Sequence, residues 1–295
     1  MVDERRVQAG DLPFQLKDAY DYLRRTLAEG GIDSADFEAR LILEHRGGFS
    51  WSDLIARGDA ILGEDIRDLI LSDLARRVAG ESLGRMYGER EFFGLPFFLS
   101  PETLEPRADT EVLVERALAI FSERGPAAIL DMGTGSGCIL ISLLSRFLDS
   151  YGVGLDLSYG ALLTARRNAA RNGVLNRSGF ICGSWGDSLG KKFDLVVSNP
   201  PYIANHVIPS LQEEVRDHDP ILGLDGGADG LQAYRDIFSG LNSLLAPDGK
   251  ALLEIGFDQG DSVMRLAEDS GFCVEGVWPD YAGLPRVVEI SSGDK

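Results

Sequence analysis

From about residue 108 onward, the sequence alternates between helix-like stretches and short apolar stretches that are typical of strands. Repeated strand–helix units favour a mostly parallel sheet with helices on both faces, because each connection must cross over the sheet. The final stretch, "FCVEGVWPDYAGLPRVVEISS", predicts two strands with no helix between them, and hence an antiparallel hairpin at the sheet edge. The predicted elements before it are, in order, a helix at 109–123, a strand at 128–131, a helix after Gly137, a strand at 153–157, a helix at 158–172, strands at 180–182 and 193–197, a helix at 231–245 and a strand at 251–255.

The region before this alternation has a different pattern. Stretches such as "DSADFEARLILEHRGG" place apolar residues at helical spacing between a capping residue and a glycine, so residues 14–82 predict a small helical bundle. The following "LGRMYGEREFFGLPFFLS" alternates aromatic residues and glycines, which indicates a β-hairpin. We therefore expect an N-terminal helical domain at 1–82, a hairpin linker at 83–107 and an α/β domain at 108–295.

Composition narrows the classes of partner. The chain has 295 residues, of which 44% are hydrophobic, so an ordinary globular core is expected. Its net charge of −18 disfavours binding that is driven by the phosphates of DNA or RNA. No apolar run is long enough to cross a bilayer, and the N-terminus lacks the apolar core of a secretory signal. We therefore expect no membrane association and a cytoplasmic location.

The sequence predicts no metal site. Its three cysteines are far apart, and none of its three histidines is grouped with a cysteine at the spacing of metal ligands. Reduced, buried thiols are the expected state of Cys138, Cys182 and Cys273.

A glycine loop follows the first predicted strand of the α/β domain, in "ILDMGTGSGCI". Glycines let the chain turn tightly and let a ligand approach the backbone, while the next helix directs its positive N-terminus at that ligand. A dinucleotide fingerprint would place a further glycine at Cys138, so the match to that motif is incomplete. The candidate cofactor-binding residues of the loop are Gly133, Thr134, Gly135, Ser136 and Gly137.

An acidic residue, Asp156, ends the second predicted strand in "VGLDLS". A carboxylate at that place can accept hydrogen bonds from the two hydroxyls of a ribose. The alternative is an ordinary helix cap, since Asp156 and Ser158 both lie where a cap could form. The loop and the acid together favour the ribose, but both S-adenosyl-L-methionine (SAM) and NAD contain one.

The motif Asn-Pro-Pro-Tyr, residues 199–202, follows the apolar strand "FDLVV". Two prolines end a strand because neither has an N–H to donate, so the turn is rigid. The Asn199 side-chain oxygen and the Pro200 carbonyl could hold a planar NH2 group, and the Tyr202 ring could lie against its face. Such a group is a poor nucleophile that gains from alignment with a methyl donor, whereas a nicotinamide enzyme has no particular use for it. The motif therefore favours SAM and N-methylation over a proline-rich surface turn.

These stretches resemble the HemK/PrmC family of protein-(glutamine-N5) methyltransferases, which modify peptide chain release factors. The resemblance covers nearly the whole chain and is carried by "EREFFGLPFFLSPETLEPRADTEVLVERAL", "ILDMGTGSGCILISLL", "GLDLSYGALLTARRNA", "FDLVVSNPPYI", "GLDGGADGLQAYRDI" and "LLEIGFDQG". It implies a seven-stranded, Rossmann-like SAM-dependent methyltransferase sheet. It also implies that the substrate is the glutamine in the Gly-Gly-Gln loop of a release factor.

The resemblance also implies roles for single residues. The 133–137 loop would hold SAM, Asp156 would bind its ribose, and Trp185 would stand near its adenine, although a core aromatic is the alternative for Trp185. The turn would bind the substrate glutamine, with Asn199 also near the methionine part of SAM, and its residues are Asn199, Pro200, Pro201 and Tyr202. Of these, Asn199, Pro200 and Tyr202 are the candidate catalytic residues.

One stretch departs from the family pattern. This chain has "EPRADTE" where the family reads closer to "IPRPETE", so Glu105 and Ala108 replace a hydrophobic residue and a proline. A change there could alter the rim of the pocket, and Arg107 is therefore not among the predicted site residues.

Three other functions fit parts of the pattern. A DNA adenine-N6 methyltransferase shares the Asn-Pro-Pro-Tyr motif, but it predicts a basic groove that this acidic chain does not suggest. A non-catalytic binding subunit with the same fold is disfavoured by the intact Gly133, Asp156 and Asn199. A nicotinamide-dependent oxidoreductase is disfavoured by Cys138 and by the motif itself.

Overall fold

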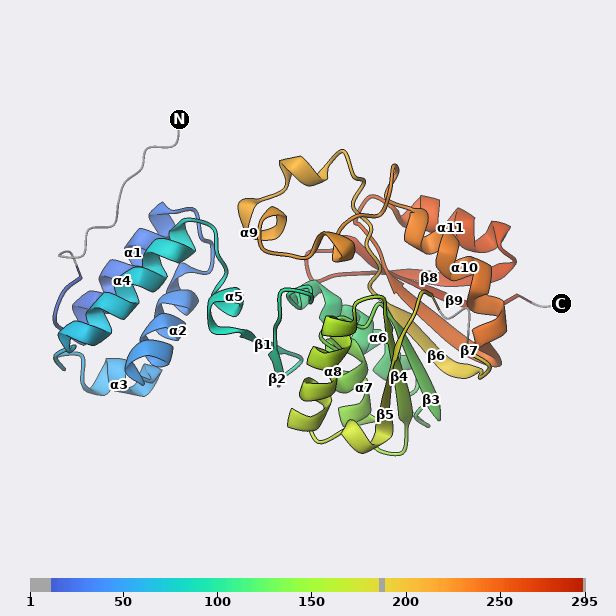
Figure 1. Ribbon diagram of the computed structural model, residues 1–295, viewed down its shortest axis with the longest axis horizontal. Helices are drawn as coiled ribbons and strands as arrows, with labels where there is room; N and C mark the ends of the chain where they lie inside the picture. Colours follow the sequence, from blue (N-terminus) through green and yellow to red (C-terminus); the bar gives the residue numbers. More distant parts are fainter. Residues whose placement is uncertain (1–11, 186–188, 294–295) are drawn as a thin grey trace. The chain divides into compact units, whose positions relative to one another are not determined.

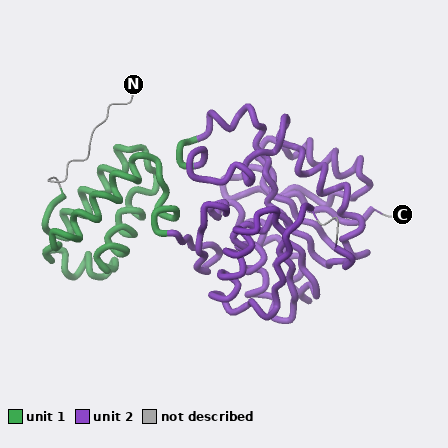
Figure 2. Tube along the Cα trace, in the orientation of Figure 1, with its two compact units in different colours: residues 1–87, 212–214 green, residues 88–211, 215–295 purple. Residues whose placement is uncertain are grey.

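The computed structural model describes residues 12–185 and 189–293, and the chain divides into two compact units (Figure 2). The first unit comprises residues 1–87 with 212–214, and the second comprises residues 88–211 with 215–295. The three-part division at residues 82 and 107 stays a prediction.

The described part of the first unit is helical, as its sequence pattern predicts (Figure 1). Its helices are α1 (Leu16–Glu29), α2 (Ala35–Gly47), α3 (Trp51–Ala56), α4 (Glu64–Val78) and α5 (Leu83–Tyr87). One apolar face of each longer helix is buried, with Leu23 of α1, Ile42 of α2 and Leu74 of α4 in one cluster. Spacing of apolar residues at three and four positions is the reason these segments form a bundle.

The second unit contains the hairpin and the α/β region. From residue 88 its strands are β1 (Glu89–Phe92), β2 (Leu95–Phe98), β3 (Ala128–Met132), β4 (Tyr151–Asp156), β5 (Ser178–Cys182), β6 (Phe193–Ser198), β7 (Leu245–Glu254), β8 (Phe272–Pro279) and β9 (Pro285–Ser292). The helices along the same stretch of chain are η1 (Ala108–Thr110), α6 (Glu111–Ile120), α7 (Cys138–Arg146), α8 (Tyr159–Arg171), η2 (Leu175–Arg177), η3 (Ile208–Ser210), α9 (Glu213–Arg216), η4 (Ile221–Gly223), α10 (Gln232–Leu244) and α11 (Gly260–Asp269).

Seven strands form one sheet in the order β5-β4-β3-β6-β7-β9-β8. Strands β3 to β7 pair in parallel, whereas β9 is antiparallel to both β7 and β8. The predicted parallel sheet and its terminal antiparallel hairpin are therefore confirmed. Helix α11 was not among the predicted elements, although Val263, Leu266 and Ala267 have helical spacing ahead of Gly271.

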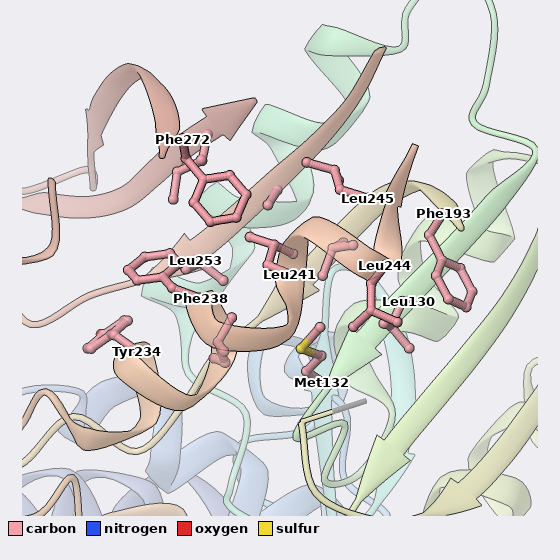
Figure 3. Close-up of a cluster of buried hydrophobic side chains, with 14 of the residues drawn as sticks. Leu130, Met132, Phe193, Tyr234, Phe238, Leu241, Leu244, Leu245, Leu253 and Phe272 are labelled. Atoms are coloured by element: carbon pink, nitrogen blue, oxygen red, sulfur yellow. The ribbon is translucent and has the colours of Figure 1, made fainter. Parts of the chain in front are cut away.

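Helices cover both faces of this sheet, with α6, α7 and α8 on one side and α10 and α11 on the other (Figure 1). Successive strand residues point to opposite faces, so Ile129 packs with the first set of helices and Leu130 with the second. Figure 3 shows the cluster on the side of α10 and α11, which includes Leu130 and Leu253 of the sheet and Phe238 of α10. Strands buried on both faces read as the continuous apolar runs seen in the sequence.

The short sheet of β1 and β2 confirms the predicted hairpin. Its two-residue turn has positive φ at both Phe93 (52°) and Gly94 (73°), the conformation that two-residue hairpin loops favour. The buried rings of Phe92 and Phe97 join the cluster under α6 and α7, which attaches the hairpin to the α/β region.

The expectation of buried thiols is wrong for two of the three cysteines. Cys182 and Cys273 are exposed because they lie on the edge strands β5 and β8, while Cys138 is half-buried. Within residues 12–185 and 189–293, no group of three or more histidine, cysteine or acidic side chains is placed to hold a metal ion. No helix in that part of the chain is both long and apolar enough to span a membrane.

Candidate active site

The carboxyl ends of β3, β4 and β6 surround a cavity of about 340 Å³ in the second unit. Ligands of open parallel sheets bind at this edge, and the volume is in the range of small-molecule sites. The predicted site residues that line it are Gly133, Thr134, Gly135, Ser136, Asp156, Trp185, Asn199 and Pro201. Gly137, Pro200 and Tyr202 are not among its lining residues.

Two glycines of the 133–137 loop leave room for a ligand. Gly133 and Gly135 have φ of +71° and +54°, and a Cβ built on either would meet no atom within 4 Å. Gly137 differs, since its Cβ would lie 2.8 Å from Ile141 Cδ1 and 3.2 Å from the Ala165 Cβ. It lets α7 and α8 pack closely, which is why it does not line the cavity.

A buried amide, Asn168 of α8, holds the glycine loop in place. Its Nδ2 donates to the carbonyls of Ser136 (2.9 Å) and Phe98 (3.0 Å), and its Oδ1 accepts from the Phe98 N–H (2.7 Å). All the donors and its acceptor are therefore used, and the side chain is fully buried. Sequence reasoning missed Asn168 because one polar residue inside a helical stretch carries no distinctive signal.

Asp156 supports the same loop from the end of β4. Its Oδ2 accepts from the Gly135 N–H and its Oδ1 from the Ser158 N–H, both at 2.8 Å. The helix cap belongs to Ser158, whose hydroxyl accepts from the Ala161 N–H at 3.1 Å. Asp156 also lines the cavity, and burial raises the pKa of this carboxyl.

Trp185 follows β5 with φ of +41°, in the left-handed region. It lines the cavity, and its ring also packs against the core cluster of α10 and the sheet. Both interpretations of Trp185, an aromatic wall and a core residue, thus have a structural counterpart. A glycine cradle, a carboxylate and an aromatic wall around one cavity fit an adenosine-containing cofactor such as SAM.

The Asn-Pro-Pro-Tyr turn begins where β6 ends. Asn199 Nδ2 donates to Thr110 Oγ1 at 3.3 Å, so the Oδ1 of the same amide lies on the side away from Thr110. Asn199 and Tyr202 line a second, small cavity of about 20 Å³ together with Arg107. Pro200 is buried behind the turn, and burial raises the pKa of Tyr202 to about 12, so its phenol is neutral.

The loop of residues 224–230, which we call the acceptor loop, packs directly on this turn. The Ile203 N–H donates to Leu224 O (3.1 Å), and the Gly226 N–H donates to Ile203 O (2.8 Å). A Cβ at Gly226 would lie 2.9 Å from Pro201 O, and one at Gly230 would lie 2.5 Å from Tyr202 O. Only glycine permits this approach, which accounts for Gly226 and Gly230 in "GLDGGADGLQAYR".

The segment before α6 supplies cavity residues that the sequence did not single out. Arg107 lines both cavities, and its Nη2 lies 3.6 Å from Asp219 Oδ2. Glu105, one of the departures from the family pattern, lies 3.4 Å from the Arg90 guanidinium of β1. The other lining residues of this segment are Glu102, Leu104, Pro106 and Thr110. The stretch "EPRADTE" was the available sequence signal for these residues. It was not used because Glu105 and Ala108 depart from the family pattern.

Two buried acidic residues, Asp131 and Glu254, lie near the carboxyl ends of β3 and β7. Asp131 precedes the glycine loop and accepts from Thr134 Oγ1 at 2.7 Å, and burial raises its pKa to about 7. Glu254 ends β7, next to the residue paired with Ser198, and burial raises its pKa to about 7 as well. Among the described residues, Glu254 Oε2 has no hydrogen-bond partner. Burial therefore raises the pKa of one carboxyl in β3 and of one at the end of β7.

Comparison with known families agrees with this architecture. The family model of the PrmC N-terminal domain matches residues 18–88, and that of the methyltransferase small domain matches residues 108–215. The release factor glutamine methyltransferase of Agrobacterium fabrum is 41% identical over 269 residues, which cover 90% of this chain and 93% of the relative. That of Bradyrhizobium diazoefficiens is 44% identical over 273 residues, which cover 90% of this chain and 92% of the relative.

The chain belongs to the release factor glutamine methyltransferase family. A solved structure, the methyltransferase from Pyrococcus furiosus, is similar with a TM-score of 0.53 and 18% identity, and it covers 76% of this chain and 99% of that one. The seven-stranded, Rossmann-like methyltransferase fold expected of the family is thereby confirmed. The resemblance of the motifs to the HemK/PrmC family is confirmed in the same way.

Proposed function

We propose that this protein methylates the side-chain amide N5 of the glutamine in the Gly-Gly-Gln loop of peptide chain release factors. One observation carries the proposal. The glycine loop after β3 and the Asn-Pro-Pro-Tyr turn after β6 line a single cavity, and close glycine contacts fix the turn to the acceptor loop. A release factor substrate would put the reaction in the cytoplasm.

S-adenosyl-L-methionine is the methyl donor, and when bound it supplies an electrophilic methyl group on a sulfonium centre. Its holding groups in this chain would be the backbone of residues 133–137, the Asp156 carboxylate at the ribose and Trp185 beside the adenine. The open space at Gly133 and Gly135 supports this assignment, because a side chain there would occupy the cavity.

The turn supplies the groups that orient the glutamine. Asn199 Nδ2 donates to Thr110 Oγ1, so the Asn199 Oδ1 faces away from Thr110 and can accept a hydrogen bond. With the Pro200 carbonyl as the second acceptor, both hydrogens of the substrate NH2 group are bound and its nitrogen can face the methyl donor. Orientation of this kind can lower a barrier by roughly 7–11 kcal/mol, and the electrophile requires no dedicated general base.

Transfer to an adenine amino group of DNA is the alternative. The relatives of this chain are named for release factor glutamine, which does not favour that alternative. The net charge of −18 also argues against attraction to a polyanion.

Mass spectrometry of a release factor after incubation with enzyme and SAM tests the proposal. We expect one added methyl group on the glutamine of the Gly-Gly-Gln loop. A release factor in which that glutamine is replaced by alanine should gain none. Duplex DNA in the same buffer should stay unmethylated. Methylation of DNA with an unmodified release factor would overturn the proposed function.

The role of Asn199 is tested by single-turnover methyl transfer at saturating SAM. We expect Asn199→Ala to lower the rate on the order of 100-fold or more, since one preorganised polar group is lost while the fold is kept. Asn199→Asp keeps an acceptor oxygen, and it should retain more activity than Asn199→Ala if the side chain acts mainly as an acceptor. Parental rates in both variants would remove the turn from the chemistry.

A further inference from the structure

The side-chain amide of Gln259, at the start of α11, joins three segments of the second unit. Its Nε2 donates to the carbonyls of Tyr202 (2.9 Å) and Gly230 (3.2 Å), and its Oε1 accepts from the Gly256 N–H (3.0 Å). The three partners belong to the Asn-Pro-Pro-Tyr turn, the acceptor loop and the segment after β7. One side chain therefore holds the turn to its two neighbours.

Two glycines make room for this amide. A Cβ at Gly230 would lie 2.7 Å from Gln259 Nε2, and a Cβ at Gly256 would lie 2.9 Å from Gln259 Oε1. Contacts this short exclude any other residue at the two positions without a shift of the backbone or of the amide. The bridge is consequently built from three positions together and not from one flexible surface side chain.

The bonding pattern also restricts the bridging residue itself. It uses both N–H donors and the oxygen of an amide at the end of a long side chain, a set of groups at this length that only glutamine provides. Glutamate has the same length and acceptors but no donor, and methionine has a similar length and neither. Loss of the donors would leave the Tyr202 and Gly230 carbonyls without this partner.

We propose that Gln259 is a positioning residue for methyl transfer, which acts by fixing the turn that receives the substrate amide. It holds Tyr202, three residues after Asn199, and it does not line the cavity assigned to SAM. Its loss should therefore lower turnover and leave SAM binding nearly unchanged. The inference rests on the proposed function, because the turn is taken as the acceptor site.

The main test is the pair Gln259→Glu and Gln259→Met, measured by single-turnover transfer to a release factor at saturating SAM. We expect the rate to fall about tenfold or more in both, because the partly buried carbonyls of Tyr202 and Gly230 each lose a donor. Calorimetry should give a SAM affinity within about threefold of the parent. The matched control is Asn172→Asp, since Asn172 Nδ2 also donates to two carbonyls, those of Pro96 and Asn168, both at 3.0 Å, and does not line the cavity. It should transfer methyl at the parental rate.

Two further measurements separate positioning from general destabilisation. In an Asn199→Ala background, Gln259→Glu should lower the transfer rate little further, because both changes act on one turn. Hydrogen exchange of the free enzyme should be faster at the amides of Ile203, Asn205 and Gly226, which bond across the turn and acceptor loop. Exchange at Gly133 and Thr134, which bond to Leu155, should stay unchanged.

The outcomes that overturn the inference differ from those that overturn the proposed function. A parental transfer rate in either folded Gln259 variant rejects the positioning role. A loss of SAM affinity as large as the loss in transfer rate rejects it too. Failure of both variants to fold would assign Gln259 to stability alone and also reject it. If the parent enzyme leaves the release factor unmethylated, the proposed function fails first, and unchanged exchange at Ile203 in Gln259→Glu would still reject the bridge.

Discussion

The two loops at the carboxyl edge of the sheet are each held by one side-chain amide that uses all of its hydrogen-bonding groups. Asn168 holds the glycine loop at Ser136, and Gln259 holds the Asn-Pro-Pro-Tyr turn at Tyr202. The two amides differ in burial, because Asn168 is fully buried whereas Gln259 is half-buried. The amide that holds the glycine loop is thus part of the core, while the amide that holds the Asn-Pro-Pro-Tyr turn is partly exposed.

The glycines of the two loops differ in the same way. Around Gly133 and Gly135 a Cβ would meet empty space, whereas at Gly226 and Gly230 it would meet backbone atoms of the turn. Glycine in the first loop leaves room for a ligand, and glycine in the second lets two protein segments touch. Glycine therefore has a different role in each loop: it forms a binding surface in the first and allows a packing contact in the second.

The largest expected effect is that of Asn168→Asp on folding. The change removes both donors and places a charge in a fully buried site against the carbonyls of Ser136 and Phe98. We expect a loss of roughly 3–5 kcal/mol in the free energy of unfolding, which is typical of an uncompensated buried charge. Chemical denaturation of the free protein measures it. The same change at the half-buried Asn172 should cost about 1 kcal/mol or less, and equal losses would contradict the contrast in burial.

Gly230→Ala should have the next largest effect and should act on turnover. Its φ of +76° and a Cβ only 2.5 Å from Tyr202 O combine backbone strain with a clash that moves the turn. We expect about 3 kcal/mol of destabilisation and a loss in turnover on the order of 100-fold, with SAM affinity largely kept.

Gly135→Ala is the contrasting variant for that prediction. Its φ is +54° and no atom lies within 4 Å of the new Cβ, so the free protein should lose only about 1 kcal/mol. The methyl group would occupy the cavity, so SAM binding should weaken while turnover at saturation changes little. A reversed pattern for Gly135 and Gly230 would mean that the two sets of glycines have been assigned the wrong roles.

Asp156→Ala should weaken SAM binding by roughly 1.5–3 kcal/mol, about 10- to 150-fold, because charged hydrogen bonds to the ribose are lost. The Asp156 carboxylate also accepts from the Gly135 N–H, so part of the effect is a looser glycine loop. Isothermal calorimetry with SAM gives the affinity, and saturating SAM should restore most of the turnover. An unchanged affinity in a folded variant would show that the ribose lies elsewhere.

Glu254→Gln should change stability in a way that depends on pH. Burial raises the pKa of Glu254 from 4.5 to about 7, so the folded state binds more protons than the unfolded state between these values. The parent protein therefore loses stability as pH rises from about 4.5 to about 7, a loss that glutamine cannot show. We expect the variant to gain at least about 1 kcal/mol relative to the parent near pH 8, and little near pH 4.5. A constant difference across this range would mean that Glu254 does not titrate there.

Most of the sheet and part of the site could be predicted from the sequence. Apolar runs and helical spacing located the strands and most helices, because each is a local property of the chain, although α11 was missed. The glycine loop and Asp156 were recognisable because their positions at strand ends bring them to one edge in any parallel sheet. Membership of the family was visible in the same motifs.

Only the tertiary structure decided which residues hold these motifs in place. Asn168 reaches Ser136 and Phe98 across 32 and 70 positions of the chain, and Gln259 reaches Tyr202 across 57. Neither amide has a distinctive sequence pattern, because its partners are backbone N–H and C=O groups, which nearly every residue possesses. The sequence alone placed the glycine loop, Asp156 and the Asn-Pro-Pro-Tyr turn at strand ends, and packing between distant segments decided which side chains hold them there.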